Sequence, residues 1–351
     1  GASPDFRAPP LGCFAGFLPK DDFRTHLYKI IKEELAKAAS YGPEDLINLG
    51  LMLDHVRAYS ELLAIIPPQK ALLQRELCIL RVKALSQCGS YSELEAMLAD
   101  HSHLPLSRGH KAVLAAHLAH QKGERVQAMH TLALSLKQAI SDLDAETVLR
   151  AAMMAEEQGW WDIASECHDW LASSGRTDVL ESLQSLFRAA ANKRDASLML
   201  GTTERMVEAR DDSLQTLTTL AYLRLLLGSR LETVSTILDR ILQRRSGGKA
   251  TADTYGSFLR AFLCYRYGDK DGLRENISGI TDWSAIPPGQ RAVSAVLLSL
   301  SGRESLAHDL AWSVRTPALL AEEHEFWTAA QRQAVAGLNQ AGNSPGNEPT
   351  K

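Results

Sequence analysis

Apolar residues recur along most of the chain with the spacing of an amphipathic helix, and short polar turns interrupt them at nearly constant intervals. Seven such turns can be aligned, and six of them contain glycine: Gly89, Gly123, Gly159, Gly228, Gly268 and Gly302. The remaining turn, Asn192–Asp195, has none. Neighbouring turns are 34 to 36 residues apart, except for the 40 residues between Gly228 and Gly268. The pattern predicts seven pairs of helices, each pair joined by one turn.

Each turn glycine is expected to take the left-handed conformation that ends a helix and lets the chain reverse. A second signal lies seven residues before each turn, where five of the seven residues are Ala: Val82, Ala116, Ala152, Phe187, Ala221, Ala261 and Ala295. Small residues also recur five residues after the turns, as at Ala128, Ala164 and Ala307. Small side chains at both places predict that the two helices of a pair cross closely.

The small residue in the first helix, the glycine turn and the small residue early in the second helix resemble the tetratricopeptide repeat (TPR). The resemblance covers residues 71–315 as about seven TPR-like repeats. Two features depart from the family pattern, because the large aromatic residue early in the first helix is missing and the proline near the repeat end is mostly absent. The resemblance implies an all-α fold, a right-handed α-solenoid of antiparallel helical hairpins. It also implies a concave face built mainly from the first helix of each hairpin.

The flanking segments have other patterns. Residues 1–19 are expected to be a linker or a cloning remnant, and 20–70 an N-terminal helical cap or an extra hairpin. A C-terminal capping helix is predicted over 316–338 and a disordered polar tail over 339–351. Within the repeats, a flexible loop is expected near Gly247 and a break at Pro287–Pro288.

Composition narrows the classes of protein. The chain has 351 residues, 45% of them hydrophobic and 23% charged, which is ordinary for a soluble globular protein. A net charge of −4 gives no basic surface, so we expect no nucleic-acid partner. The five cysteines are far apart and form no CxxC pair, which argues against a disulfide framework and a structural zinc site.

Two short segments approach known catalytic motifs and fail at a required residue. Gly247–Thr251 ends like a phosphate-binding loop but lacks the upstream glycine and a hydroxyl residue directly after the lysine. His324–Thr328 begins like the zinc helix motif, but threonine replaces the second histidine. We therefore expect no enzyme activity, no cofactor and no metal site.

Histidine and aromatic residues are concentrated in two places. Six of the eleven histidines lie between residues 101 and 130, and His110, His117 and His120 share the face of a first helix that would line the groove. They form a polar groove wall, a metal site or a pH-sensitive contact. The sixth repeat carries Tyr255, Phe258, Phe262, Tyr265 and Arg266, which either bind a partner or pack on neighbouring helices. In the same register are Lys83, Glu146, Glu156, Arg188 and Tyr222, so the groove is expected to have mixed charge. At the third turn we expect Trp161 in the core and Trp160 exposed.

Three hypotheses follow. The leading one is a non-enzymatic scaffold that binds a peptide or partner protein through the concave face. A second is the soluble domain of a membrane-anchored assembly or envelope factor, because the chain starts without Met and an upstream anchor would be tethered through residues 4–19. That hypothesis rests on a resemblance to bacterial TPR proteins with N-terminal anchors, and it leaves open the bacterial cytoplasm or envelope. A third is a metal-binding protein or enzyme that uses the histidine-rich second repeat.

Overall fold

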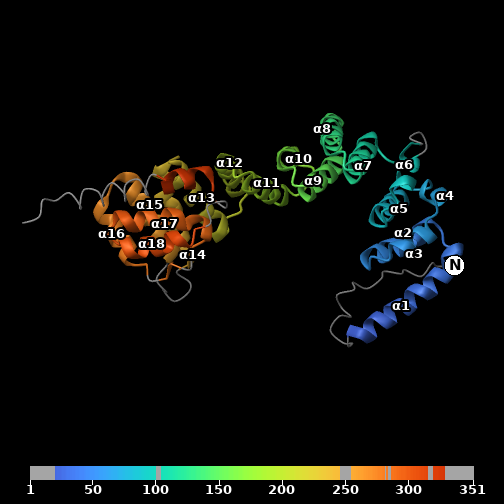
Figure 1. Ribbon diagram of the computed structural model, residues 1–351, viewed down its shortest axis with the longest axis horizontal. Helices are drawn as coiled ribbons and strands as arrows, with labels where there is room; N and C mark the ends of the chain where they lie inside the picture. The colour runs from blue at the N-terminus through green and yellow to red at the C-terminus, as the bar shows by residue number, and fades with distance from the viewer. Residues whose placement is uncertain are drawn as a thin grey trace, which may run out of the picture. The chain divides into compact units, whose positions relative to one another are not determined.

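The computed structural model describes residues 20–99, 104–245, 254–280, 282–283, 286–314 and 319–328 (Figure 1). Over these residues the chain is all-α and contains no β-strand. The predicted linker at 1–19, the loop at 246–253, the tail at 339–351, and His101 and His103 lie outside the described residues. The all-α prediction is confirmed for the part of the chain that the structure describes.

Two helices surround each of the seven turns, and we call the first the A helix and the second the B helix of a pair. The pairs are α5 (Arg75–Gln87) and α6 (Tyr91–Ala99), α7 (Arg108–Gln121) and α8 (Arg125–Ser141), α9 (Ala145–Glu157) and α10 (Trp161–Ser174), α11 (Val179–Lys193) and α12 (Ala196–Glu208), α13 (Leu214–Leu227) and α14 (Val234–Arg245), α15 (Thr254–Tyr267) and α16 (Lys270–Ser278), and α17 (Arg291–Leu300) and α18 (Glu304–Trp312). Helices pack on their neighbours in chain order, as α10 does on α11 and α12 on α13. Sequential packing of this kind is compatible with a helical repeat.

The turns between A and B helices share one geometry. All six predicted turn glycines have positive φ, and Arg194 takes the same left-handed conformation, with φ of 59°, in the turn without glycine. In each turn the amide of the next residue donates to a carbonyl five residues back, as Glu124 does to Ala119 at 2.9 Å and Asp195 to Ala190 at 3.0 Å. This is the Schellman motif, which satisfies carbonyl groups that the helix end leaves without a donor. The predicted role of the turn residues is therefore confirmed.

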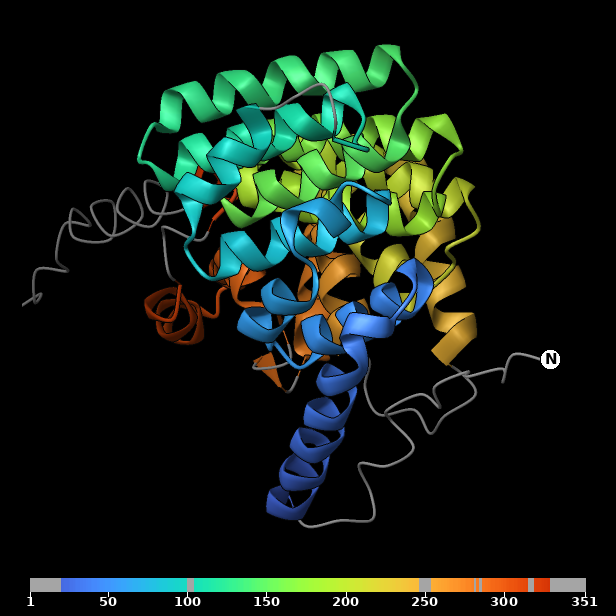
Figure 2. The ribbon, with the colours of Figure 1, turned by 90° about the vertical axis from the view of Figure 1, so that its right-hand side faces the viewer.

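The chain divides into two compact units between Thr147 and Val148. The N-terminal unit begins with α1 (Lys20–Lys37) and η2 (Ala38–Ser40), followed by α2 (Pro43–His55), α3 (Tyr59–Ile65) and α4 (Pro68–Ala71). The outer part of α1 projects away from α2 to α4 (Figure 2). Helices α2 and α3 pack on each other and on α5, and the turn between them has Arg57 in the left-handed conformation. Because this is the geometry of the seven later turns, α2 and α3 form an additional helix pair before the repeats.

A buried arginine ties this additional pair to the first repeat. Arg81 on α5 is almost fully buried, and its guanidinium donates to the carbonyls of Leu63 and Ile66 at the end of α3. The same guanidinium forms an ion pair with Glu93 on α6. Because the last carbonyls of α3 have no donor within their own helix, Arg81 replaces the missing partners and joins three helices.

The core of the C-terminal unit is centred on α13, α15 and α17. Leu217, Phe258, Phe262 and Val293 are fully buried in it. The proline break predicted before the last repeat is present as the short 3-10 helix η5 (Pro288–Gln290), while a second 3-10 helix, η3 (Leu231–Thr233), precedes α14. Of the predicted capping helix, residues 321–328 are helical and 329–338 lie outside the described residues.

None of the described helices combines the length and the apolar character that crossing a membrane requires.

Candidate binding surface

The A helices repeat one register that places several of the predicted site residues on the same face of their own helix. Counting back from the left-handed residue of each turn, the sixth and third preceding residues lie on the same face, because three residues advance a helix by nearly one turn. The sixth position holds Lys83, His117, Arg188, Tyr222 and Phe262, and the third holds His120, Glu156 and Tyr265. In each unit we call the surface formed by these positions the A-helix face.

Consecutive A helices of the N-terminal unit are joined across this face by polar pairs. Lys83 Nζ lies 2.7 Å from Asp54 Oδ2, and His117 Nε2 lies 2.8 Å from Ser86 Oγ. Asp54 and Ser86 are each three residues before a left-handed turn residue, Arg57 and Gly89. The third position of one helix therefore contacts the sixth position of the next, and we call each such pair a rung. Sequence reasoning missed Asp54 and Ser86, although the same register identifies both.

The C-terminal unit contains a corresponding rung. Glu156 Oε2 lies 3.7 Å from an Arg188 guanidinium nitrogen, and Glu156 Oε1 lies 3.0 Å from Nε2 of the buried His168. Burial lowers the pKa of His168, and the neighbouring Arg188 lowers it further, while Glu156 opposes the shift. The Arg188 side chain remains 59% exposed, so the rung orients this cation without removing it from solvent.

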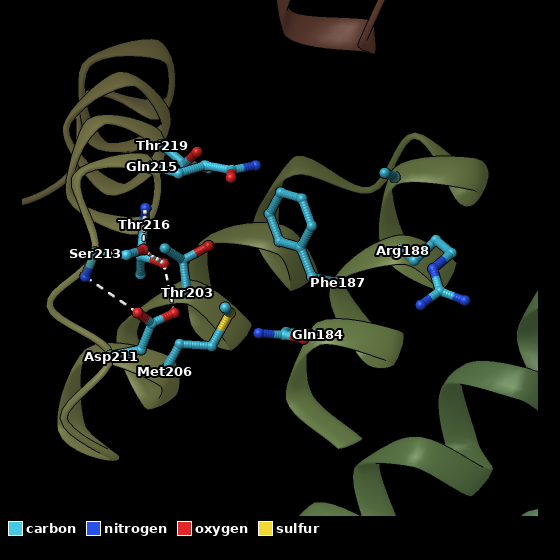
Figure 3. Close-up of a pocket in the computed structure, with 11 residues that line it drawn as sticks. Gln184, Phe187, Arg188, Thr203, Met206, Asp211, Ser213, Gln215, Thr216 and Thr219 are labelled. Carbon is cyan, nitrogen blue, oxygen red and sulfur yellow. Dashed lines mark hydrogen bonds between the residues drawn. The ribbon is translucent and has the colours of Figure 1, made fainter. Parts of the chain in front are cut away.

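Beside Arg188, the A-helix face is hollowed between α11, α12 and α13 (Figure 3). The hollow has a volume of about 480 Å³ and is open to solvent. Its lining mixes one aromatic ring with amides, hydroxyls and a cation: Gln184, Phe187, Arg188, Ala191, Thr203, Met206, Asp211, Ser213, Gln215, Thr216 and Thr219. An apolar anchor surrounded by polar groups is the usual composition of a binding surface.

The loop at the floor of the hollow is fixed by Asp211. Its carboxylate accepts hydrogen bonds from the Thr216 hydroxyl at 2.7 Å and from the Ser213 amide at 3.1 Å, drawn as dashed lines in Figure 3. Although burial alone raises the pKa of Asp211, these hydrogen bonds lower it overall. The lining residues at the start of α13 are therefore held in place by a charged acceptor.

Further along α13 and on α15, the A-helix face is covered by the chain itself. Residues 321–328 lie on it, and the Tyr222 hydroxyl donates to Glu323 Oε1 at 2.5 Å. The Phe326 ring meets Phe262 and Tyr265 edge-on, with centroids 5.5 and 5.3 Å apart. Phe258 and Phe262 are fully buried and Tyr222 nearly so. The structure thus places the predicted aromatic site residues in contact with one another, under a C-terminal helix and not in an open groove.

Arg266 and Tyr255 flank this covered region. Arg266 donates to the carbonyls of Leu225 and Leu226 at 2.7 and 2.5 Å, at the end of α13. Its guanidinium also lies 5.4 Å from the Phe262 ring centre and 5.9 Å from that of Phe326. Burial lowers the pKa of Arg266. The Tyr255 hydroxyl donates to Gln290 Oε1 at 2.6 Å, which joins α15 to η5.

The remaining predicted residues are placed separately. His110 is buried in the first turn of α7, where the Ser107 hydroxyl accepts from its backbone amide at 3.1 Å, and His120 is half-buried. Glu146 forms an ion pair with Arg75. No three His, Cys, Asp or Glu side chains of the described residues are grouped so that they could hold a metal ion. The structure therefore brings the aromatic residues together, and it places His117 and His120 half-buried on the A-helix face of α7 while His110 is buried.

No protein family matches the chain, and no curated protein matches its sequence.

Proposed function

We propose that this chain is a non-enzymatic, TPR-like protein-interaction scaffold, a right-handed α-solenoid that binds a peptide or partner helix through the concave A-helix face. One observation carries the proposal. The open hollow of α11 to α13 lies directly beside a part of the same face that already holds a helix, residues 321–328. A face that binds one helix with side chains from its A helices has the shape to bind another next to it.

The hollow also lies where the repeat departs from its own pattern. The α11–α12 pair has Phe187 at a position where five of the seven pairs have Ala, and Arg194 at the turn position where six have Gly. The Phe187 ring is only partly buried and points into the hollow in Figure 3. A large, partly exposed ring in place of a small packing residue favours contact with another molecule.

Arg188 favours a ligand that carries a negative charge next to the hollow. It is exposed, it lines the hollow, and its ion pair with Glu156 is long at 3.7 Å. Such an exposed ion pair adds about 0–1 kcal/mol, so the guanidinium is available to a partner carboxylate. The favoured ligand is therefore a peptide or helix that presents an apolar side chain to Phe187 and an acidic group to Arg188.

The test is a selection of peptides from a displayed library on the full chain, followed by calorimetric measurement of Kd. Phe187→Ala and Arg188→Ala are each expected to weaken the selected peptides at least about tenfold, the loss of one central interface contact. Asp239→Ala, an exposed substitution on α14 outside the hollow, is the matched control and should leave Kd unchanged. Selected peptides that bind equally well to both hollow variants would refute the hollow as the site.

A further inference from the structure

The segment that covers the aromatic part of the A-helix face has a definite side-chain pattern. Leu319, Leu320, Glu323, Phe326 and Trp327 form a buried or half-buried stripe. Glu322 and Thr328 beside it are also half-buried, while Ala321, His324 and Glu325 are exposed. This stripe has the i, i+3, i+4, i+7 spacing of a helix that docks on one face. Figure 1 shows the ribbon of residues 321–328 in dark red beside α13.

The stripe includes a buried carboxylate, that of Glu323, with few partners to offset the cost of its burial. Glu323 is 3% exposed, and its hydrogen-bond donors are the Tyr222 hydroxyl at 2.5 Å and the Leu320 amide at 2.9 Å. Among the described residues no cation pairs with it, because the guanidinium of nearby Arg266 donates to backbone carbonyls. Glu322 Oε2 is also buried and has no hydrogen-bond partner in the described part of the chain.

These two neighbouring carboxyl groups weaken the docking of the segment. Taking a carboxylate out of water without a cation costs several kcal/mol, and adjacent like charges add repulsion. The apolar and aromatic side chains favour docking while Glu322 and Glu323 oppose it. A short helix held by such opposing terms belongs to the least stable elements of a fold, which open before the core does.

The covered region is continuous with the open hollow along α13. Gln215 and Thr219 line the hollow, and Tyr222 lies on the same helix face. From Thr219 to Tyr222 the helix advances only about 4.5 Å. A partner helix that fills the hollow and extends one turn further therefore meets Tyr222 and the end of residues 321–328.

We propose that the aromatic surface of Tyr222, Phe262, Tyr265 and Arg266 is a docking site for a partner helix of acidic–aromatic pattern, and that residues 319–328 occupy it as an internal competitor. The partner presents two leucine-like residues, a carboxylate for the Tyr222 hydroxyl, and an aromatic ring three residues later for Phe262 and Tyr265. It has a residue without negative charge where this chain has Glu322, and so binds without that buried carboxylate. This inference rests on the proposed function, since it extends the same binding face.

The experiment measures binding of a fluorescent peptide with the sequence of residues 316–330, carrying Glu322→Ala, to the full chain by anisotropy. In the full-length Phe326→Ala variant the internal segment loses its aromatic anchor, and the peptide should bind at least about tenfold more tightly than to the wild type. Glu322→Gln in the full chain removes one of the two opposing charges and should weaken peptide binding. Because the two variants move Kd in opposite directions, general unfolding cannot produce both results.

Two controls complete the experiment. A peptide that also carries Phe326→Ala should lose at least about tenfold in affinity, because it lacks the aromatic ring that meets Phe262 and Tyr265. In the wild type, saturating peptide should accelerate amide hydrogen exchange in residues 321–328 and leave α7 unchanged.

Three results would overturn the inference: equal peptide affinity for the wild type and Phe326→Ala, unchanged exchange in 321–328, or dimers in which the segment docks on a second copy. The Phe187→Ala test of the hollow is read out independently. Library peptides that depend on Phe187, combined with failure of the 316–330 peptide, would refute this inference and leave the proposed function standing.

Discussion

Helix α13 presents one face to two different environments. At Gln215 and Thr219 the face lines an open hollow, and at Tyr222 it is buried under residues 321–328. The same register position gives the exposed cation Arg188 on α11 and the buried Tyr222 on α13. The repeat therefore determines where a side chain points, whereas burial depends on which segment lies over it.

Two phenylalanines, one in each region, should differ most in how much they stabilise the fold. Phe262→Ala removes a fully buried ring from the covered region and should lower the free energy of unfolding by about 3–5 kcal/mol. Phe187→Ala removes a partly buried ring from the open hollow and should cost about 1 kcal/mol. Urea denaturation of both variants measures the difference. Similar losses would mean that the hollow is closed in solution.

A second pair of variants compares hydroxyl groups one turn apart on α13. Tyr222→Phe leaves the buried Glu323 Oε1 without its donor and should cost about 1–3 kcal/mol. Thr219→Val, in the hollow, should change stability by no more than about 0.5 kcal/mol. Denaturation curves followed by circular dichroism measure both. An unchanged midpoint for Tyr222→Phe would show that the segment is undocked.

A third comparison concerns the turn between α11 and α12, two of the helices that line the hollow. Arg194 has φ of 59° without the freedom of glycine, so Arg194→Gly should stabilise the chain by about 0.5–1 kcal/mol. The reciprocal change, Gly123→Ala, should destabilise by a similar amount, because φ there is 83° while a Cβ would meet no atom within 4 Å. Thermal melts of the two variants should shift in opposite directions. A loss of stability in Arg194→Gly would mean that the arginine side chain makes a contact that outweighs its backbone strain.

The pH dependence of local stability should differ in sign between residues 321–328 and helix α10. Burial raises the pKa of Glu323 above its ordinary 4.5, and Glu322 raises it further, although the Tyr222 hydroxyl and the Leu320 amide oppose the shift. A folded-state pKa above the unfolded one means that docking is strongest below pH 4.5 and weakens as pH rises through the raised pKa. Tyr265 and Arg266 contact the Phe326 ring, and Tyr255 lies near the Tyr222 hydroxyl, as further ionisable groups of this site. Hydrogen exchange of 321–328, corrected for intrinsic rates, should accelerate with pH, and Glu323→Gln should abolish the trend.

The stability of α10, which carries His168 next to the Glu156–Arg188 rung, should change with pH in the opposite direction. Burial lowers the pKa of His168 below its ordinary 6.5, with Glu156 and Arg188 as its charged neighbours. A lowered folded-state pKa contributes stability above pH 6.5 that is lost as pH falls through the shifted value. Amide exchange in α10, corrected in the same way, should therefore accelerate on acidification. The same pH response in His168→Gln would assign the effect to another group.

Sequence reasoning predicted the helix pairs because their determinants are local. A left-handed residue at the turn and apolar spacing in the helices need no knowledge of distant contacts, and even the turn without glycine could be aligned. The expectation for Trp160 and Trp161 was wrong: Trp160 is buried and Trp161 is half-buried. The closing hydrogen bond of this turn, from the Trp160 amide to Ala155, has the same form at all the other turns, and Glu124 at the equivalent position is exposed, so the local pattern does not determine which of the two rings is buried.

The covering of the aromatic surface could not be predicted in the same way. Tyr222 and Glu323 are 101 residues apart in the chain, and no periodicity connects them. The prediction of a capping helix over 316–338 identified the segment but not the helix face that it covers. The rungs, in contrast, could be predicted from the sequence, because Asp54 and Ser86 occupy the same register as the predicted residues. Long-range docking is thus the part of the site that local pattern leaves undetermined.

The rungs also affect how this chain can change in evolution. Each rung joins the third position of one A helix to the sixth position of the next, as Asp54 joins Lys83 and Ser86 joins His117. Duplication of the α5–α6 pair would keep both of these rungs and create one new contact, between Ser86 of the first copy and Lys83 of the second. Serine and lysine are compatible neighbours, so a helix pair could be gained without a buried clash. The face could then lengthen by whole units while its existing contacts stay intact.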